Sequence, residues 1–233
     1  MPHSKKRLSL KRNKKPVITT MYNILYKTYG PQGWWPASTP FEVVVGAILT
    51  QNTSWSNVEK AILNLKNKKL FTPDHLHKAS LKILAKAIMP CGYYNIKAGR
   101  LKNFTRFLFA NYKGRIENMR SKTSAALRDE LLAINGIGPE TCDSILLYAL
   151  NKPVFVVDAY TRRIAECLNL AEKSHDYDSI QSMFADSLPG DASLFNEYHA
   201  LIVCHAKNVC RKKPECGKCV LHRLKKDSDA SLH

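Results

Sequence analysis

One stretch of this chain, residues 131–162, restricts its possible folds more than any other. It reads LLAINGIGPETCDSILLYALNKPVFVVDAYTR, in which a Gly136-Ile137-Gly138 turn separates two apolar helical patterns. Glycine takes positive φ without steric cost and lets a phosphate approach the backbone closely. Pro139 suits the first position of the following helix. The free N–H groups at the start of that helix predict an anion site beside the turn.

A carboxylate follows this turn at a fixed distance along the chain. Asp158 comes directly after the apolar residues 154–157, which would bury the backbone around it. A rigidly held carboxylate can stabilise positive charge on a sugar and can orient or deprotonate a water molecule. Asp is also a favoured helix N-cap, and a cap would fix the same side chain in one rotamer. A phosphate-binding turn followed by a rigidly positioned carboxylate indicates chemistry on the sugar or backbone of a nucleic acid.

The G-I-G turn and the V-V-D-A-Y-T-R segment resemble the helix-hairpin-helix-GPD superfamily of DNA glycosylases, the endonuclease III group. The resemblance extends over roughly residues 17–222 in one order. It implies an all-α fold of two helical lobes with a DNA-binding cleft, a helix-hairpin-helix motif and a C-terminal loop whose cysteines hold a metal cluster. The expected organisation is a disordered basic arm (1–15), an N/C-terminal lobe that carries the catalytic Asp158 (16–41 and 153–203), a central lobe ending in the hairpin (42–152), and an Fe–S cluster loop (204–226).

The chain carries a formal net charge of +17, concentrated at its two ends. Eight Lys or Arg residues and no acidic residue precede Glu42. Between positions 204 and 226 there are eight more basic residues and one acid, Glu215. Such patches suit a polyanion and predict salt-dependent binding, although a merely solubilising surface is the alternative.

Apolar periodicity and turn residues predict a nearly all-helical chain. Residues 41–49 and 154–157 are rich in β-branched side chains and also fit buried strands. For the first we expect a helix, from its length and the family resemblance, and for the second an extended connector after Pro153. The expected helices are 17–28, 41–51, 55–67, 80–88, 95–111, 124–134, 139–150, 159–168, 176–187 and 192–208.

The residue at position 140, here Glu140, bears on whether an amine or a water molecule is the nucleophile. The resemblance implies that bifunctional relatives carry at this position a lysine whose amine attacks the sugar C1′ and forms a Schiff base. A carboxylate cannot form that imine, so the sequence favours a monofunctional enzyme that uses water. Glu140 also suits the first turn of a helix because of the helix dipole.

Three tryptophans are candidates for a base pocket. Trp34, Trp35 and Pro36 precede an L-T-Q-N-T segment, and Trp55 follows it; this pattern resembles the 3-methyladenine DNA glycosylase III subgroup. A flipped base is held by stacking and edge contacts, and a positively charged alkylated purine gains a cation–π attraction. The alternative is that these rings are ordinary core or lobe-interface residues.

The resemblance also implies residues that contact the duplex. Gln51 matches a residue that enters the gap left by a flipped base, and Tyr93 matches a second wedge. The alternatives are a polar helix end for Gln51 and a loop tyrosine for Tyr93. The full set of expected DNA contacts is Gln51, Tyr93, Gly136, Ile137, Gly138, Thr141, Arg211 and Lys212.

Four of the seven cysteines lie between positions 204 and 219 with the spacing C-x5-C-x5-C-x2-C. Clustered cysteines in a cytosolic protein indicate a metal rather than disulfides, and four thiolates hold a [4Fe–4S] cluster or zinc. The family spacing is C-x6-C-x2-C-x5-C, so its fourth cysteine would fall near Lys225 and is absent. We expect Cys204 to replace it, in a set of Cys204, Cys210, Cys216 and Cys219; an empty site is the alternative. The remaining Cys91, Cys142 and Cys167 are expected to be small buried hydrophobes.

The sequence as a whole predicts a monofunctional base-excision-repair glycosylase acting on an alkylated purine. The alternatives are a bifunctional glycosylase and AP lyase, a glycosylase for uracil or mismatched thymine, and a damage-recognising DNA-binding module without catalysis. The expected partner is double-stranded DNA with a damaged base, bound by a monomer. We expect no membrane span and a cytoplasmic, nucleoid-associated location.

Overall fold

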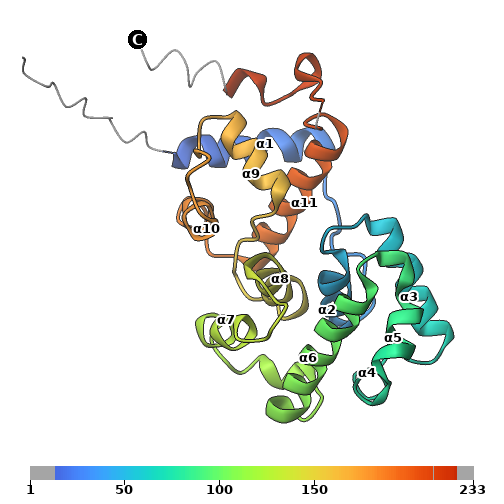
Figure 1. Ribbon diagram of the computed structural model, residues 1–233. Helices are drawn as coiled ribbons and strands as arrows, with labels where there is room; N and C mark the ends of the chain where they lie inside the picture. The colour runs from blue at the N-terminus through green and yellow to red at the C-terminus, as the bar shows by residue number, and fades with distance from the viewer. Residues whose placement is uncertain (1–13, 212, 225–233) are drawn as a thin grey trace, which may run out of the picture.

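The computed structural model describes residues 14–211 and 213–224, and within them every regular element is helical (Figure 1). The predicted all-α class is therefore confirmed. Residues 1–13, Lys212 and residues 225–233 lie outside the described part, and with them most of the expected basic arm. No helix in the described ranges is both long and apolar enough to cross a membrane. The elements are α1 (Lys15–Tyr29), α2 (Pro40–Thr50), α3 (Trp55–Asn67), α4 (Pro73–Lys78), α5 (Leu81–Ala87), η1 (Met89–Cys91), α6 (Tyr94–Tyr112), η2 (Ile116–Met119), α7 (Ser124–Leu132), α8 (Pro139–Ser144), η3 (Ile145–Ala149), α9 (Ala159–Cys167), α10 (Tyr177–Ala185), α11 (Ala192–Asn208) and η4 (Cys216–Lys218).

Both ambiguous segments adopt the conformations expected from the sequence. Residues 41–49 lie within α2, which begins where the Thr39 side chain accepts a hydrogen bond from the Glu42 N–H and Pro40 takes the first turn. Residues 154–157 form a connector without regular secondary structure. The structure adds α4, a short helix that is not among the expected ones and that begins where the Thr72 side chain accepts a hydrogen bond from the His75 N–H.

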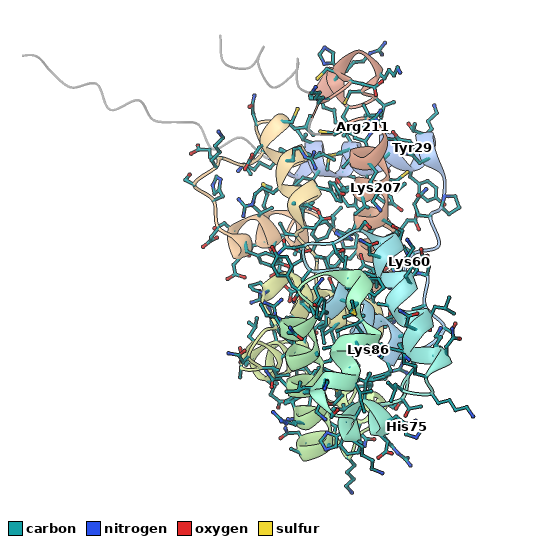
Figure 2. All side chains as sticks on the ribbon, turned by 45° about the vertical axis from the view of Figure 1, so that its right-hand side comes forward. Tyr29, Lys60, His75, Lys86, Lys207 and Arg211 are labelled. Carbon is teal, nitrogen blue, oxygen red and sulfur yellow. The ribbon has the colours of Figure 1, made fainter. Side chains whose placement is uncertain are left out.

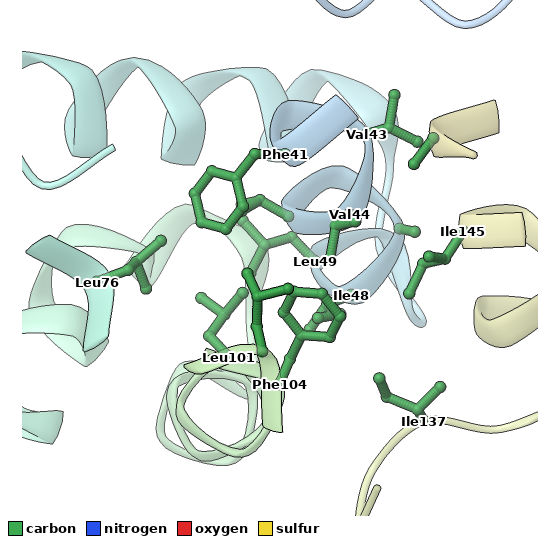
Figure 3. Close-up of a cluster of buried hydrophobic side chains, with 14 of the residues drawn as sticks. Phe41, Val43, Val44, Ile48, Leu49, Leu76, Leu101, Phe104, Ile137 and Ile145 are labelled. Atoms are coloured by element: carbon green, nitrogen blue, oxygen red, sulfur yellow. The ribbon is translucent and has the colours of Figure 1, made fainter. Parts of the chain in front are cut away.

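The buried apolar side chains form two separate cores. The larger draws on residues 41–150 and surrounds α2, whose residues 41–49 are all buried (Figure 3). The smaller joins α1 to α9, α10 and α11. In Figure 1 these four helices make up the upper half of the molecule and α2 to α7 the lower half, with α8 between them. The second helix of the hairpin continues into a π-helix, η3, whose Tyr148 packs against both cores.

An ion pair fixes the second hairpin helix. Asp143 of α8 has no exposed surface, and its carboxylate accepts hydrogen bonds from Arg128 Nε at 2.9 Å and Gln181 Nε2 at 2.6 Å. Arg128 also reaches Asp178 at 2.7 Å. Because Arg128 belongs to α7 and Gln181 to α10, the buried carboxylate ties both helices to α8.

Candidate active site

The Asp158 carboxylate is held in a defined position at the start of α9. Its Oδ1 accepts hydrogen bonds from the Thr161 N–H at 2.7 Å and from the Thr161 hydroxyl at 2.9 Å. The preceding Phe155, Val156 and Val157 are buried, and 13% of the Asp158 side chain is exposed. The cap uses one carboxylate oxygen, which leaves Oδ2 free for another role.

His199 of α11 faces that second oxygen. Its Nε2 lies 3.6 Å from Asp158 Oδ2, and its Nδ1 is hydrogen-bonded to the Tyr148 hydroxyl at 2.5 Å. Burial raises the pKa of Asp158, but His199 and the Thr161 hydrogen bonds outweigh it, so the pKa lies below its ordinary value. The Asp158 carboxylate is therefore charged at neutral pH.

Sequence reasoning missed His199 and Tyr148. The histidines show no metal-ligand spacing, and Tyr148 reads as one more aromatic residue in a buried helix. The available signal was the position of His199 on the apolar face of the long helix at 192–208, where it is 5% exposed. A buried polar group requires a partner: Tyr148 is hydrogen-bonded to Nδ1, whereas Nε2 faces Asp158 Oδ2 at 3.6 Å and has no hydrogen-bond partner among the described residues.

Glu140 lies in the first turn of α8, as expected for an acid at a helix start. The residue reaches the surface, but the surrounding protein raises the pKa of its carboxyl, and the negative charge of Asp158 raises it further. His199 partly opposes this shift. Position 140, where the resemblance implies a lysine nucleophile, is therefore close enough to Asp158 for the two charges to interact.

The three tryptophans form one aromatic cluster. The Trp35 and Trp55 rings meet edge to face with centroids 5.2 Å apart, and Trp34 lies 5.5 Å from Trp35. A Cβ at Gly46 of α2 would lie 3.3 Å from Trp35 and 3.4 Å from Trp55, so this glycine lets both rings rest on the helix. Pro36 follows the cluster and is exposed.

The cluster is connected to Asp158 through Tyr148 and His199. The Trp35 ring centroid lies 5.1 Å from that of Tyr148, whose hydroxyl binds His199. The indole Nε1 atoms of Trp34 and Trp35 are buried without a hydrogen-bond partner among the described residues. Buried donors without a partner are uncommon in folded proteins, so these two mark the aromatic cluster as a candidate place for a polar ligand.

Side chains from the end of α2 and from α6 support the hairpin turn. The Gln51 Nε2 donates to the Gly136 carbonyl at 3.2 Å and to the Thr141 hydroxyl at 2.8 Å, while Arg100 donates to the Gln51 Oε1. Only Gly136 of the two hairpin glycines has a positive φ, +95°; Gly138 lies at −94°. In this structure Gln51 is thus part of the hairpin's support rather than a free helix-end side chain.

The remaining expected DNA contacts have different surroundings. Tyr93 is 69% exposed and has a φ of +45°, so its ring stands out from the loop before α6. Ile137 is buried at 5% exposure and anchors the hairpin turn. Arg211 pairs with Glu215, which also binds Lys218.

The C-terminal cysteines do not all converge. Cys210, Cys216 and Cys219 line one open cavity beside α9, but Cys204 is not among its lining residues. The expectation that Cys167 is a small buried residue is wrong, because it is exposed at the end of α9. Within the described ranges, no three His, Cys, Asp or Glu side chains already stand in a metal-binding arrangement.

Comparison with known proteins places the chain in a family. The model of the HhH-GPD superfamily base excision DNA repair proteins matches residues 45–189, more than half of the chain. The protein belongs to this superfamily.

Individual relatives agree with this assignment. The chain is 51% identical over 212 residues to the protein named "Putative DNA repair glycosylase MJ1434" of Methanocaldococcus jannaschii, covering 90% of this chain and 96% of the relative. It is 30% identical to endonuclease III of Thermotoga maritima, over 78% of this chain and 80% of that protein. The crystal structure of H. pylori 3-methyladenine DNA glycosylase bound to 1,N6-ethenoadenine superposes with a TM-score of 0.73 and 29% identity, covering 84% of this chain and 98% of that one.

Proposed function

We propose that this HhH-GPD protein is a monofunctional DNA glycosylase that flips an alkylated purine out of the duplex and hydrolyses its N-glycosidic bond. The observation that carries the proposal is the continuous path from Trp35 through Tyr148 and His199 to Asp158. It joins an aromatic cluster suited to a base to a charged carboxylate suited to a sugar cation.

Asp158 has the properties that the reaction requires. Loss of the base develops positive charge on the deoxyribose, which a fixed carboxylate stabilises most strongly when water is excluded. The lowered pKa keeps Asp158 charged, and Thr161 fixes its orientation. His199 faces the second carboxylate oxygen and helps to lower the pKa of Asp158, and Tyr148 is hydrogen-bonded to the other nitrogen of the imidazole.

The surroundings of Asp158 favour water over an amine as the nucleophile. Thr161 and His199 lower the pKa of Asp158, and Asp158 in turn raises the pKa of Glu140 and Tyr148; none of these four side chains is an amine. Lys152, nearby in sequence, is occupied by the Arg120 and Lys122 carbonyls. These observations favour a glycosylase without lyase activity, unlike the Schiff-base route expected of a lysine at position 140.

The aromatic cluster favours an alkylated purine as substrate. Rings of Trp34, Trp35 and Trp55 can stack on a flipped base and attract its positive charge. The likeness to the H. pylori 3-methyladenine DNA glycosylase, at 29% identity, points in the same direction.

We propose that the duplex is held by the hairpin and by the basic surface. Gly136, Gly138 and Thr141 lie at or just before the start of α8, whose N–H groups suit a phosphate. We propose that Tyr93 enters the opened duplex, and that Gln51 does so by giving up its hydrogen bonds to Gly136, Thr141 and Arg100. Exposed basic side chains occur along the whole length of the molecule: Figure 2 shows Arg211, Lys207, Lys60 and Lys86 one below another. A single copy of the chain contains all of these groups, so we propose that it acts as a monomer.

We also propose a bound metal centre in the C-terminal loop, a [4Fe–4S] cluster with zinc as the alternative. The residues fit this group, because Cys210, Cys216 and Cys219 line one cavity and thiolates are its usual ligands. When bound, the metal would cross-link a short loop that buries few side chains of its own. The reaction at Asp158 does not involve it.

The decisive experiment is release of single defined bases from duplex DNA by the wild-type protein and by Asp158→Asn. Release of 3-methyladenine or a related alkylated purine, without strand cleavage and lost in the variant, supports the proposal. Strand cleavage with a borohydride-trapped adduct would instead indicate a bifunctional enzyme. Equal binding by both proteins without release of any lesion would indicate a non-catalytic damage-recognition module. Release of uracil or mismatched thymine alone would show that the substrate is one of these bases and not an alkylated purine.

A further inference from the structure

A cavity of about 500 Å³ lies between α9 and the C-terminal loop. The loop contributes Cys210, Cys216 and Cys219 to its wall, and α9 contributes Cys167. Four cysteines from segments more than forty positions apart in the sequence thus line one space.

The position of Cys167 follows from the geometry of α9. The helix also contributes Ala159 and Arg163 to the wall, and the three residues are spaced four apart. Residues with this spacing share one face of a helix. Cys167 is therefore the last residue of the face that α9 turns toward the loop, which explains why it is exposed rather than packed in the core.

The sulfur atoms are close enough to influence one another. Burial raises the pKa of the Cys210 thiol, and among the nearby sulfurs Cys167 raises it most, followed by Cys219 and Cys216. The pKa of Cys219 is likewise raised by burial and then by Cys167 and Cys216 among its neighbours. These mutual effects agree with the shared cavity wall in placing the Cys167 sulfur near those of Cys210 and Cys219.

Cys204 has different neighbours. Its Sγ accepts a hydrogen bond from Asn208 Nδ2 at 3.5 Å, and, like Cys219, it lies close enough to Tyr29 to raise the pKa of that phenol. It does not line the cavity. Its position six residues before Cys210 suggested a ligand only because sequence spacing does not show the direction in which α11 turns each side chain.

We propose that Cys167, in place of Cys204, supplies the fourth thiolate of the metal centre, together with Cys210, Cys216 and Cys219. This inference rests on the metal centre in the proposed function and names its ligands. Four thiolates suit either a [4Fe–4S] cluster or tetrahedral zinc. Since Asp158 caps one end of the nine-residue helix α9 and Cys167 forms the other, the metal would fasten the helix that carries the proposed catalytic carboxylate.

The test compares Cys167→Ser with Cys204→Ser in the full chain, purified without oxygen. Iron, sulfide and zinc per chain are measured, together with visible absorption and electron paramagnetic resonance. Cys167→Ser is expected to lose the metal or to hold iron that a chelator removes far faster, while Cys204→Ser retains the wild-type content. Wild-type content in Cys167→Ser, with loss in Cys204→Ser, would overturn the assignment.

The imidazole of His205 is the competing ligand, because its Nε2 lies 3.4 Å from Cys219 Sγ. Retention of the metal in His205→Gln supports Cys167. Loss in His205→Gln, with retention in Cys167→Ser, would overturn the proposal and name the histidine.

Differential alkylation of the wild-type protein provides a test that does not depend on folding of a variant. Cys167 should be protected while the metal is bound and should react after chelation, whereas Cys204 should react equally in both states. Equal reactivity of Cys167 in both states would overturn the proposal. A wild-type protein with no iron or zinc would overturn both the metal centre and the role of Cys167, and the base-release assay would still decide the glycosylase activity separately.

Discussion

The Nε2 atom of His199 lies 3.6 Å from the Oδ2 atom of Asp158, on the side of the carboxylate that the Thr161 cap leaves free. The two residues come from different helices, α11 and α9, so the contact depends on the packing of the smaller core. It gives the carboxylate two separate supports, a local hydrogen-bonded cap and a long-range imidazole. These supports can be removed one at a time.

Asp158→Asn should abolish base release without unfolding the protein. Asparagine caps helices about as well as aspartate, so the free energy of unfolding should change by less than about 1 kcal/mol. Loss of the charge that stabilises the sugar cation should lower the single-turnover rate by at least about 100- to 1,000-fold. Thermal unfolding and base release measured on the same sample check both parts. Asp158→Ala serves as the comparison, since it should lose about 1 kcal/mol of stability as well.

His199→Gln should change the pH dependence of base release. In the wild-type protein His199 helps to hold the pKa of Asp158 below its ordinary value, against the effect of burial. Without the imidazole that pKa should rise, so the acidic limb of the rate profile should move to higher pH. The exposed His75, at the far end of the molecule in Figure 2, provides the control: His75→Gln should leave the profile unchanged. An unshifted acidic limb in His199→Gln would contradict this role.

The same shift predicts how stability depends on pH. A carboxyl whose folded pKa is depressed contributes stability that is present above its unfolded pKa and is lost as the pH falls through its folded pKa. Asp158 should therefore stabilise the fold at neutral pH and stop doing so in acid, below the ordinary Asp value of about 3.9. Denaturant unfolding at a series of pH values should show a smaller acid-induced loss for Asp158→Asn than for the wild type. Equal losses would show that the carboxyl is not selectively stabilised in the folded state.

Glu140→Lys should introduce a Schiff-base reaction. The carboxyl is close enough to Asp158 for its pKa to be raised by that charge, so an amine at the same position should reach the vicinity of the sugar. Borohydride should then trap a covalent adduct with DNA that the wild type does not form. Glu140→Gln, which has no amine nucleophile, is the matched control and should form none. Failure of the lysine variant to be trapped, with base release intact, would place position 140 too far from C1′.

The two hairpin glycines should respond differently to alanine. At Gly136 the φ of +95° and the Arg100 side chain, which an added Cβ would overlap, make alanine strained, and we expect a loss of about 1 kcal/mol or more. At Gly138 the backbone is extended and no atom lies within 4 Å of an added Cβ, so stability should be retained. The Gly138→Ala methyl group should still weaken DNA binding, because it projects where a phosphate would approach. Chemical denaturation and duplex-binding titrations separate these effects.

Arg128→Met should lower the free energy of unfolding more than Asp178→Ala, which removes the second ion-pair partner of Arg128. It leaves the fully buried Asp143 carboxylate without its cation, which typically costs about 3–5 kcal/mol. Asp178 is exposed, so Asp178→Ala should cost no more than about 1 kcal/mol. Equal losses of unfolding free energy in the two variants would show that the Arg128–Asp143 pair contributes no more to stability than the Arg128–Asp178 pair.

Local features of the chain account for the parts of the structure that were predicted. The helices at 55–67 and 192–208 begin and end at the expected residues, because caps, breakers and apolar spacing act within a few positions. The hairpin turn and the position of Asp158 at a helix start follow from glycine conformation and side-chain capping in the same way.

Only the tertiary structure brings distant residues together. Nothing near Asp158 in sequence indicates His199 or Tyr148, because their contact depends on how α9 packs against α11. Nothing near the C-terminal cysteines indicates Cys167, because its position depends on how α9 packs against the loop. The sequence by itself determined the helices, the turn and the types of reactive group. The packing of the two cores decided which groups meet, because the direction of a side chain depends on its helix face and on the neighbours against which that helix is buried.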